Sequence, residues 1–371
     1  MLEDRSRAVP DVVASAATRG VNFGQVAKLL LSLGIGALLV YGLHKGGVPL
    51  LPPASAFSQM RWWTVPAYVG LLGASLYFRG IRWRLLLRPI APVSSLEALN
   101  AVLVGSAAVL LMPLRLGETV RPVLIARGGR VSAVSALGTV VVERILDGLA
   151  LSLILGAALL VVPTIVPLPA SVVGIPIATG AVRGYAWTFL ITFSAAFTAI
   201  LVFHSAQAWG IRMTHAIFDK ISPRLGQIVA STLERFASGL GFFRHRGLAL
   251  RFLGETAIYW FLAALGYWLL GWGTGVVHAD QSNMSFGEAC AIMGMLGIAA
   301  ALPGPPGLIG VFQAGAYAAM TMYFPRTVVT GPGSAYVFLL YVLQVGFVTV
   351  SAAVCMVINA VSGARQLRVP Q

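Results

Sequence analysis

Long apolar runs with almost no charged residues recur along this chain and restrict what it can fold into. They lie at about residues 25–43, 63–80, 136–162, 184–203, 251–272 and 336–361. A helix needs roughly 20 apolar residues to cross a bilayer, so each run predicts a transmembrane helix. Only 10% of the residues are charged, whereas a soluble domain carries about a quarter. The sequence therefore predicts an all-α integral membrane protein with about six full spans.

Two further apolar regions are interrupted by proline and glycine. Residues 97–127 are broken at "MPLRLGE", and residues 287–323 at "LPGPPGLIG". Each arm is short for a full crossing, proline removes a backbone donor, and glycine permits a tight turn. We therefore predict two re-entrant helical hairpins, with four ordinary short spans as the alternative. The residues expected to make the breaks are Pro113, Gly117, Pro303, Gly307 and Gly310.

The distribution of basic residues predicts the orientation. If the N-terminus is cytoplasmic and the hairpins do not cross, 22 Lys and Arg residues fall on the cytoplasmic side and 4 on the other side. This asymmetry follows the positive-inside rule. Residues 1–24 and 362–371 are then cytoplasmic, residues 25–361 form the membrane domain, and the hairpins enter from opposite sides. Opposed hairpins with related Pro-x3-Gly breaks suggest an inverted repeat.

The stretch 207–248 mixes apolar and basic residues and is interrupted at "SP". We predict cytoplasmic amphipathic helices on the membrane surface, with a simple basic connection as the alternative.

Two short windows concentrate charge inside this apolar chain. "LMPLRLGETVRP" begins at residue 111, and "VVVERILDGLALSLILG" begins at residue 140. An ionisable side chain within a span costs roughly 2.5–3.5 kcal/mol on insertion scales unless it is paired or hydrated. We therefore expect the charges of the two windows to pair with each other. The arginines are Arg115, Arg121 and Arg144, and the acids are Glu118, Glu143 and Asp147.

Three interpretations of these windows stay open. They form a salt-bridge cluster that fixes the first hairpin, a lipid-headgroup site in which guanidinium groups bind phosphate, or a proton or ion relay through the acids. Enzymatic chemistry is not expected, because acids alone do not make a nucleophile–base pair. The cysteines and histidines show no metal-ligand spacing, so we expect no metal and no cofactor.

Two other sequence features are candidate binding positions, but each also has a purely structural interpretation. "FRGIRWRLLLRP" offers Arg79, Arg82 and Arg84 as candidate cytoplasmic phosphate contacts, although a basic helix end at that face needs no ligand. Gln313, after the second break, is a candidate to line a cavity or to pack in the core.

The ordered series "RGIRWRLLL", "MPLRLGETVRPVLIA", "VVVERILDGL" and "PGPPGLIGVFQAG" resembles the lysylphosphatidylglycerol synthase transmembrane-region family. The resemblance runs over roughly residues 20–360. It implies a protein of the bacterial plasma membrane that moves or handles lipids, without the soluble aminoacyltransferase domain and therefore without aminoacyl transfer. The positions that match the family pattern are Arg115, Gly117, Glu118, Arg121, Glu143, Arg144, Asp147, Pro303, Gly307 and Gly310.

Two departures from the family pattern bear on mechanism. The family commonly has Glu where this chain has Gln313, which places a proton-coupled step at that position in doubt. The form "PGPPG" replaces the commoner "PGG" and is expected to stiffen the turn.

The sequence thus predicts a flippase or transporter for a phospholipid or another anionic lipid, with membrane lipids as partners and no nucleic acid. One alternative is a non-transporting membrane subunit that docks or regulates a lipid-modifying enzyme through residues 207–248. Another is a small-solute or ion transporter.

Overall fold

The computed structural model describes residues 23–112, 117–165, 181–219, 222–301 and 304–366. This part of the chain is helical, as predicted, and contains no strand beyond one isolated bridge. The α-helices are α2 (Phe23–Lys45), α3 (Thr64–Leu87), α4 (Ser95–Leu111), α5 (Val120–Ala126), α6 (Ala133–Val161), α7 (Ala181–Ser205), α8 (Gln207–Phe218), α9 (Pro223–Ser238), α10 (Arg246–Gly273), α11 (Phe286–Ala301), α12 (Val311–Met320), α13 (Arg326–Thr330) and α14 (Pro332–Gln366). Short 3₁₀ turns are η1 (Ala54–Phe57), η3 (Gly241–Arg244) and η4 (Pro306–Leu308).

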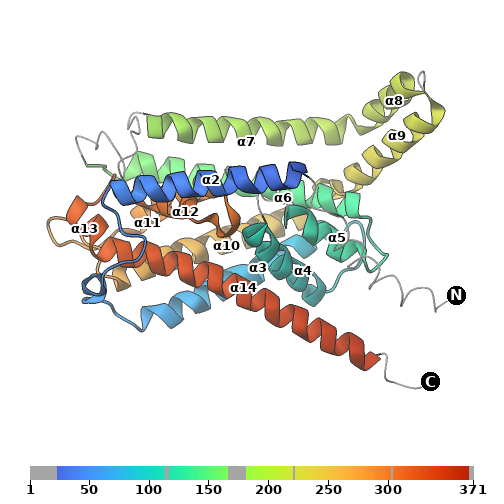
Figure 1. The fold of residues 1–371 in the computed structure, drawn as a ribbon. Helices are drawn as coiled ribbons and strands as arrows, with labels where there is room; N and C mark the ends of the chain where they lie inside the picture. Colours follow the sequence, from blue (N-terminus) through green and yellow to red (C-terminus); the bar gives the residue numbers. More distant parts are fainter. Residues whose placement is uncertain (1–22, 113–116, 166–180, 220–221, 302–303, 367–371) are drawn as a thin grey trace.

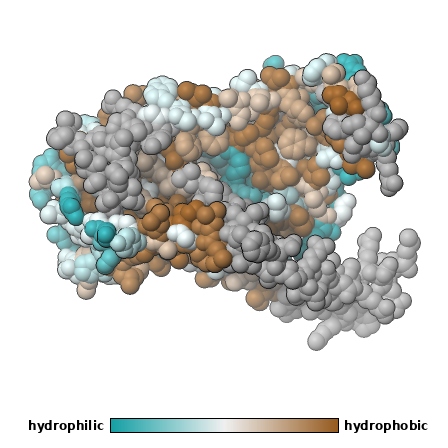
Figure 2. Space-filling model, turned by 45° about the horizontal axis from the view of Figure 1, so that its top comes forward, coloured by the Kyte–Doolittle hydropathy of each residue, from teal (hydrophilic) through white to brown (hydrophobic). Residues whose placement is uncertain are grey.

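Four helices of the described residues are long and apolar enough to cross a membrane, namely α6, α7, α10 and α14. The spans predicted at 25–43 and 63–80 correspond to α2 and α3. Helix α3 is 24 residues long, but its second half contains three arginines. Figure 2 shows hydrophobic residues over the middle of one face, hydrophilic residues at both ends and a recessed hydrophilic patch between. The assignment as an all-α membrane protein is confirmed.

The start of the first hairpin is fixed by its own sequence. Ser94 accepts a hydrogen bond from the backbone N–H of Glu97 at 3.2 Å, and Glu97 accepts one from the N–H of Ser94 at 2.9 Å. This reciprocal pair satisfies two N–H groups that a helix start leaves without partners. Arg130, beyond α5, forms an ion pair with Glu97, so the two ends of the hairpin are joined at the same end of the bundle.

Close backbone packing holds α4 and α5 together. A Cβ atom at Gly117 would lie 2.1 Å from the carbonyl carbon of Ala108, and a Cβ at Gly105 would lie 2.8 Å from the Cβ of Arg121. No side chain fits at Gly117 without moving the helix backbone. The glycine in "RLGE" therefore lets the returning arm reach α4 and brings Arg121 with it.

The second break needs glycine for a different reason. Gly307 and Gly310 have φ angles of +74° and +84°, a region that residues with a Cβ rarely adopt. The hydroxyl of Tyr341 donates to the carbonyl of Gly307 at 2.9 Å, and the N–H of Gly310 donates to Oε1 of Gln313 at 2.8 Å. Two polar groups of the broken backbone are thus hydrogen-bonded within the protein, as membrane depth requires.

The two hairpins point toward each other. In Figure 1, α4 and α5 lie toward the end of the bundle that carries α8 and α9, whereas α11 and α12 lie toward the end that carries α13. The turn η4 of the second hairpin contacts α4 of the first. This arrangement fits the predicted opposed re-entrant hairpins. Pro113 and Pro303 lie outside the described residues.

The buried apolar residues form two cores. One joins the C-terminal half of α3 to α4, the start of α6 and the start of α10. The other joins the C-terminal half of α6 to α11, α12 and α14. Glu143 and Asp147 lie between Val142 of the first core and Leu155 of the second. The charged residues of α6 therefore occupy the boundary between the two cores.

Candidate functional site

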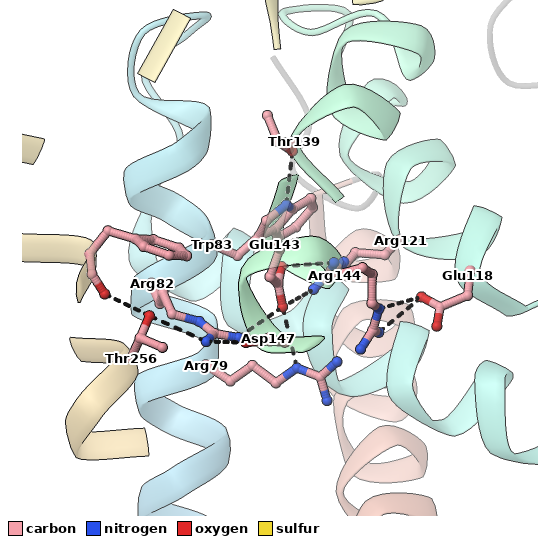
Figure 3. A network of polar contacts seen from close by, with 11 residues as sticks. Arg79, Arg82, Trp83, Glu118, Arg121, Thr139, Glu143, Arg144, Asp147 and Thr256 are labelled. Atoms are coloured by element: carbon pink, nitrogen blue, oxygen red, sulfur yellow. Dashed lines mark hydrogen bonds and ion pairs between the residues drawn. The ribbon is translucent and has the colours of Figure 1, made fainter. Parts of the chain in front are cut away.

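Glu143 is the centre of a buried charge cluster (Figure 3). Its Oε2 lies 2.8 Å from Nη2 of Arg121, and its Oε1 lies 3.2 Å from Nη2 of Arg82 and 3.5 Å from Nε of Arg79. The carboxylate side chain is fully buried. Three guanidinium groups from α3 and α5 thus converge on one carboxylate of α6, which links the first hairpin to α3 and α6.

Arg82 also binds Asp147 through two parallel contacts. The distances are 2.5 Å from Nη1 to Oδ1 and 2.9 Å from Nη2 to Oδ2, and Nη1 lies 3.4 Å from Oγ1 of Thr256. The side chain of Arg82 has no exposed area. This fork-on-fork geometry is among the strongest pairings that a carboxylate makes, and it ties α3 to α6 and α10.

Aromatic rings cover the guanidinium groups that face the cores. The guanidinium carbon of Arg82 lies 4.8 Å from the ring centre of Tyr259, and that of Arg121 lies 4.5 Å from the ring of Trp83. Each such contact contributes about 0.5–2 kcal/mol. The indole N–H of Trp83 donates to Oγ1 of Thr139 at 3.0 Å, which fixes that ring.

A second pair lies at the edge of the cluster. Nη2 and Nε of Arg144 lie 2.9 and 3.1 Å from Oε2 of Glu118. Their side chains are 32% and 23% exposed, in contrast to the buried centre. This pair joins Glu118, two residues before α5, to α6 and leaves both charges partly accessible.

The cluster lies deep within the bundle. Glu143 and Asp147 are 10 and 14 residues beyond the first residue of α6, which places them roughly 15 and 21 Å along a helix about 43 Å long. A polar cluster near the middle of a span is costly unless it is paired, and the contacts above supply that pairing.

A cavity of about 320 Å³ lies where the two hairpins meet. It is bounded by Ser106 and Val109 of α4, Gly307 and Phe312 of the second hairpin, and residues of α3, α10, α11 and α14. Among the described residues that line it, Arg79 alone is charged. Arg79 makes one long contact, with Glu143, and keeps 13% of its side chain exposed.

A second cavity, of about 520 Å³, lies between α6, α7 and α10 and is lined by Glu118, Arg144 and Asp147. It shares Tyr259 and Trp260 with the first cavity. A narrow gap between the two has Arg79, Gly117, Glu118, Arg121 and Arg144 on its walls. The charge cluster thus forms the partition between two open spaces.

A third cavity, of about 280 Å³, continues along α6 and α7. Its walls are mostly apolar, with Leu153, Leu160, Trp187 and Leu190, and it shares Ser152 with the second cavity. An apolar groove therefore adjoins the polar cavity.

The sequence profile of the family described as "Lysylphosphatidylglycerol synthase TM region" matches residues 25–352. The chain belongs to this family. Membership agrees with the resemblance found in the sequence and indicates a role connected with membrane lipids. No curated protein and no solved structure matches the chain.

The structure brings five of the six predicted headgroup residues together, three in the network around Glu143 and two in the adjoining pair. Glu143 pairs with Arg121, Arg144 pairs with Glu118, and Asp147 pairs with Arg82. The sixth, Arg115, lies outside the described residues. Among the described residues, no group of histidine, cysteine or acidic side chains could hold a metal ion.

Of the other candidate residues, one lines the first cavity and three make structural contacts instead. Arg82, considered as a cytoplasmic phosphate contact, is buried in two ion pairs instead, and Arg84 donates through Nε to the carbonyl of Val93 at 2.8 Å. Arg79 reaches the cavity. Gln313, considered as cavity lining, is buried, caps α12 and is not among the residues that line the cavity.

Sequence reasoning missed the residues of α10 and the aromatic partners. Thr256 and Tyr259 lie three residues apart within an apolar run, so they share a helix face. That spacing indicates that the two side chains point the same way, but a single sequence does not indicate that both contact Arg82.

Proposed function

We propose that this protein moves an anionic lipid between the two leaflets of the membrane. The headgroup would pass through the polar cavities, and the acyl chains would stay in the bilayer. The observation that carries the proposal is an excess of positive charge on the partition between the cavities. There, the described residues of the cluster comprise four arginines and three carboxylates.

The excess is placed where a headgroup could reach it. Arg82 and Arg121 are 0% and 4% exposed and are committed to carboxylates. Arg79 faces the first cavity and Arg144 faces the second. A phosphate between them would meet guanidinium donors on both sides of the partition, and guanidinium binds phosphate through parallel hydrogen bonds. The headgroup contacts in this proposal are therefore Arg79 and Arg144, with Arg115 still a prediction.

The acyl chains need no polar path. The apolar groove of α6 and α7 adjoins the second cavity, and most of the side chains of α7 that the structure describes face outward. A lipid whose headgroup rests near Arg144 could lay one chain along Trp187 and Leu190. A small polar path beside an apolar groove suits a lipid better than a hydrated ion.

Purified protein in liposomes tests the proposal. Phosphatidylglycerol with a fluorescent acyl chain is placed in both leaflets, and a membrane-impermeant quencher reports how fast inner-leaflet lipid reaches the outside. We expect movement in the wild type and at least a tenfold loss in Arg79→Gln, because a charge-assisted hydrogen bond contributes about 1.5–3 kcal/mol. Arg88→Gln is the matched control, since Arg88 is exposed at the end of the same helix.

Three outcomes contradict the proposal. If folded Arg79→Gln and folded wild type move lipid at equal rates, Arg79 is not a headgroup contact. A wild type that moves no lipid, but supports a lipid-modifying enzyme through α8 and α9, would favour the docking alternative. Flux of a small solute that depends on Glu143 would favour the solute-transporter alternative.

A further inference from the structure

The first cavity contains a second polar group at a distance from the charge cluster. Nε2 of Gln344 donates to the hydroxyl of Tyr68 at 2.9 Å and to the hydroxyl of Tyr267 at 3.0 Å. The three residues come from α14, α3 and α10, and all three line the cavity. We call them the tyrosine–glutamine group. None of them carries charge, and none contacts the arginines.

This group has hydrogen-bonding capacity left over. Each tyrosine hydroxyl accepts from Gln344, so its own hydrogen remains to be donated. Oε1 of Gln344 accepts no hydrogen bond from a described residue. Tyr68 and Tyr267 are 2% and 8% exposed, and buried polar groups are costly unless they are bonded. Two donors and one acceptor thus remain in a group that lines the cavity.

The group and Arg79 lie at different points of one path. Tyr68 and Arg79 are 11 residues apart on α3, close to three full turns. They therefore lie on the same side of the helix, roughly 16 Å apart along its axis. A headgroup that moves through this cavity thus meets the guanidinium of Arg79 at one point of its path and the neutral hydroxyl and amide groups at another.

The same cavity is unfavourable for an ammonium group. None of its described lining residues is acidic, and Arg79 is the one charged residue among them. The ring of Tyr259, which could bind a cation through its face, already has Arg82 at 4.8 Å. A cationic headgroup would meet Arg79 and find no acidic side chain on the described walls of this cavity, which disfavours it in a low-dielectric site.

We infer that the lipid carried by this protein has a phosphate headgroup bearing uncharged hydroxyl groups, of the glycerol, polyol or sugar type, and no ammonium group. Arg79 binds the phosphate, and the tyrosine–glutamine group binds the hydroxyls. This inference rests on the proposed function and names the class of its substrate.

Transport rates for lipids that differ only in headgroup test the inference. Liposomes with purified protein receive acyl-labelled phosphatidylglycerol, phosphatidylinositol, phosphatidic acid, phosphatidylethanolamine or lysylphosphatidylglycerol. We expect the two hydroxyl-bearing anionic lipids to move at least about fivefold faster than the two that carry an ammonium group. A difference of one or two hydrogen bonds and one unfavourable charge produces such a ratio.

Variants then identify the residues responsible. Tyr68→Phe combined with Tyr267→Phe, and separately Gln344→Leu, should slow phosphatidylglycerol and phosphatidylinositol about 3- to 10-fold. Phosphatidic acid, which has no hydroxyl substituent beyond its phosphate, should move at the wild-type rate. Tyr336→Phe is the control, because Tyr336 is a buried tyrosine whose hydroxyl has no partner among the described residues and which does not line the cavity.

The possible failures are distinguishable. Ammonium-bearing lipids that move as fast as phosphatidylglycerol would overturn the substrate class and leave the transport proposal standing. Equal slowing of phosphatidic acid by the variants would show that the group does not bind hydroxyls. If the wild type moves no lipid, the proposed function fails. Native mass spectrometry then still tests the binding preference, which retention of phosphatidylglycerol over phosphatidylethanolamine would support and equal retention would overturn.

Discussion

Arg82 and Asp147 form a bidentate ion pair inside the helix bundle, at 2.5 Å from Nη1 to Oδ1 and 2.9 Å from Nη2 to Oδ2. Arg82 precedes Asp147 by 65 residues in the chain, and its side chain is completely buried. Since Arg82 also lies 3.2 Å from Glu143, one side chain of α3 neutralises parts of two carboxylates of α6. We regard this pair as the structural part of the cluster and Arg79 as the part available to a ligand.

Removing Arg82 alone should be strongly destabilising. In Arg82→Met, Asp147 loses its two contacts and Glu143 loses one of three. An uncompensated buried charge costs about 3–5 kcal/mol, and we expect that loss in the free energy of unfolding. Reversible unfolding in mixed detergent micelles, followed by circular dichroism, measures it.

Removing both partners should restore most of that stability. The double variant Arg82→Met with Asp147→Leu leaves apolar side chains between α3 and α6, and such replacements of buried pairs are often close to neutral. The control is Arg130→Met, whose partner Glu97 is 42% exposed, and which should cost less than about 1 kcal/mol. If the double variant is as unstable as Arg82→Met, the unpaired charge of Asp147 is not the cause of the instability of Arg82→Met.

The close contact between Gly117 and the backbone of α4 predicts a steric effect of any larger residue at position 117. In Gly117→Ala the new Cβ would lie 2.1 Å from the backbone of Ala108, and backbone cannot rotate away as a side chain can. We expect a loss of about 1–3 kcal/mol and slower lipid movement, because Glu118 and Arg121 shift with the arm. Thermal unfolding and the quenching assay measure the two effects.

Gly254→Ala is the matched control for that variant. Nothing lies within 4 Å of a Cβ at Gly254 in the middle of α10, so alanine should stabilise the helix by up to about 1 kcal/mol. If Gly117→Ala behaves like Gly254→Ala, the hairpin does not pack as described.

The sequence predicted an all-α membrane protein because a bilayer leaves few choices. Apolar runs of span length must be helices, and proline with glycine inside such runs must interrupt them. It also predicted that the charges around Glu118 and Glu143 would come together, since isolated charges are too costly at that depth.

The pairings themselves could not be predicted, because they depend on how helices pack. Arg79 and Arg82 are three residues apart and share a face of α3, whereas Arg84 points elsewhere, to the carbonyl of Val93. That spacing was visible in the sequence, but the partner on α6 was not. The tyrosine–glutamine group gave no signal at all, since each member is a single neutral polar residue within an apolar run.

The hydrogen bond from Gly310 to Gln313 predicts how substitutions at Gln313 behave. Gln313→Ala leaves the buried N–H of Gly310 without its acceptor at 2.8 Å, and loss of a helix cap costs about 1 kcal/mol. Gln313→Glu keeps an acceptor at the same place, and in acidic buffer, where its carboxyl is protonated and no charge is buried, it should retain stability within that margin. Unfolding of both variants in detergent distinguishes the cap from a residue that only fills space.

Finally, the orientation predicted from the charges can be measured on intact cells. Even without Arg79, Arg82, Arg121 and Arg144, which the structure places in the charge cluster, 18 basic residues lie on the predicted cytoplasmic side and 4 on the other. We therefore expect a membrane-impermeant maleimide to label Ser58→Cys and to leave Gln227→Cys unlabelled until the cells are opened. Both positions are exposed, and the variants are made without Cys290 and Cys355, the two native thiols. Labelling of Gln227→Cys in intact cells would reverse the assigned orientation.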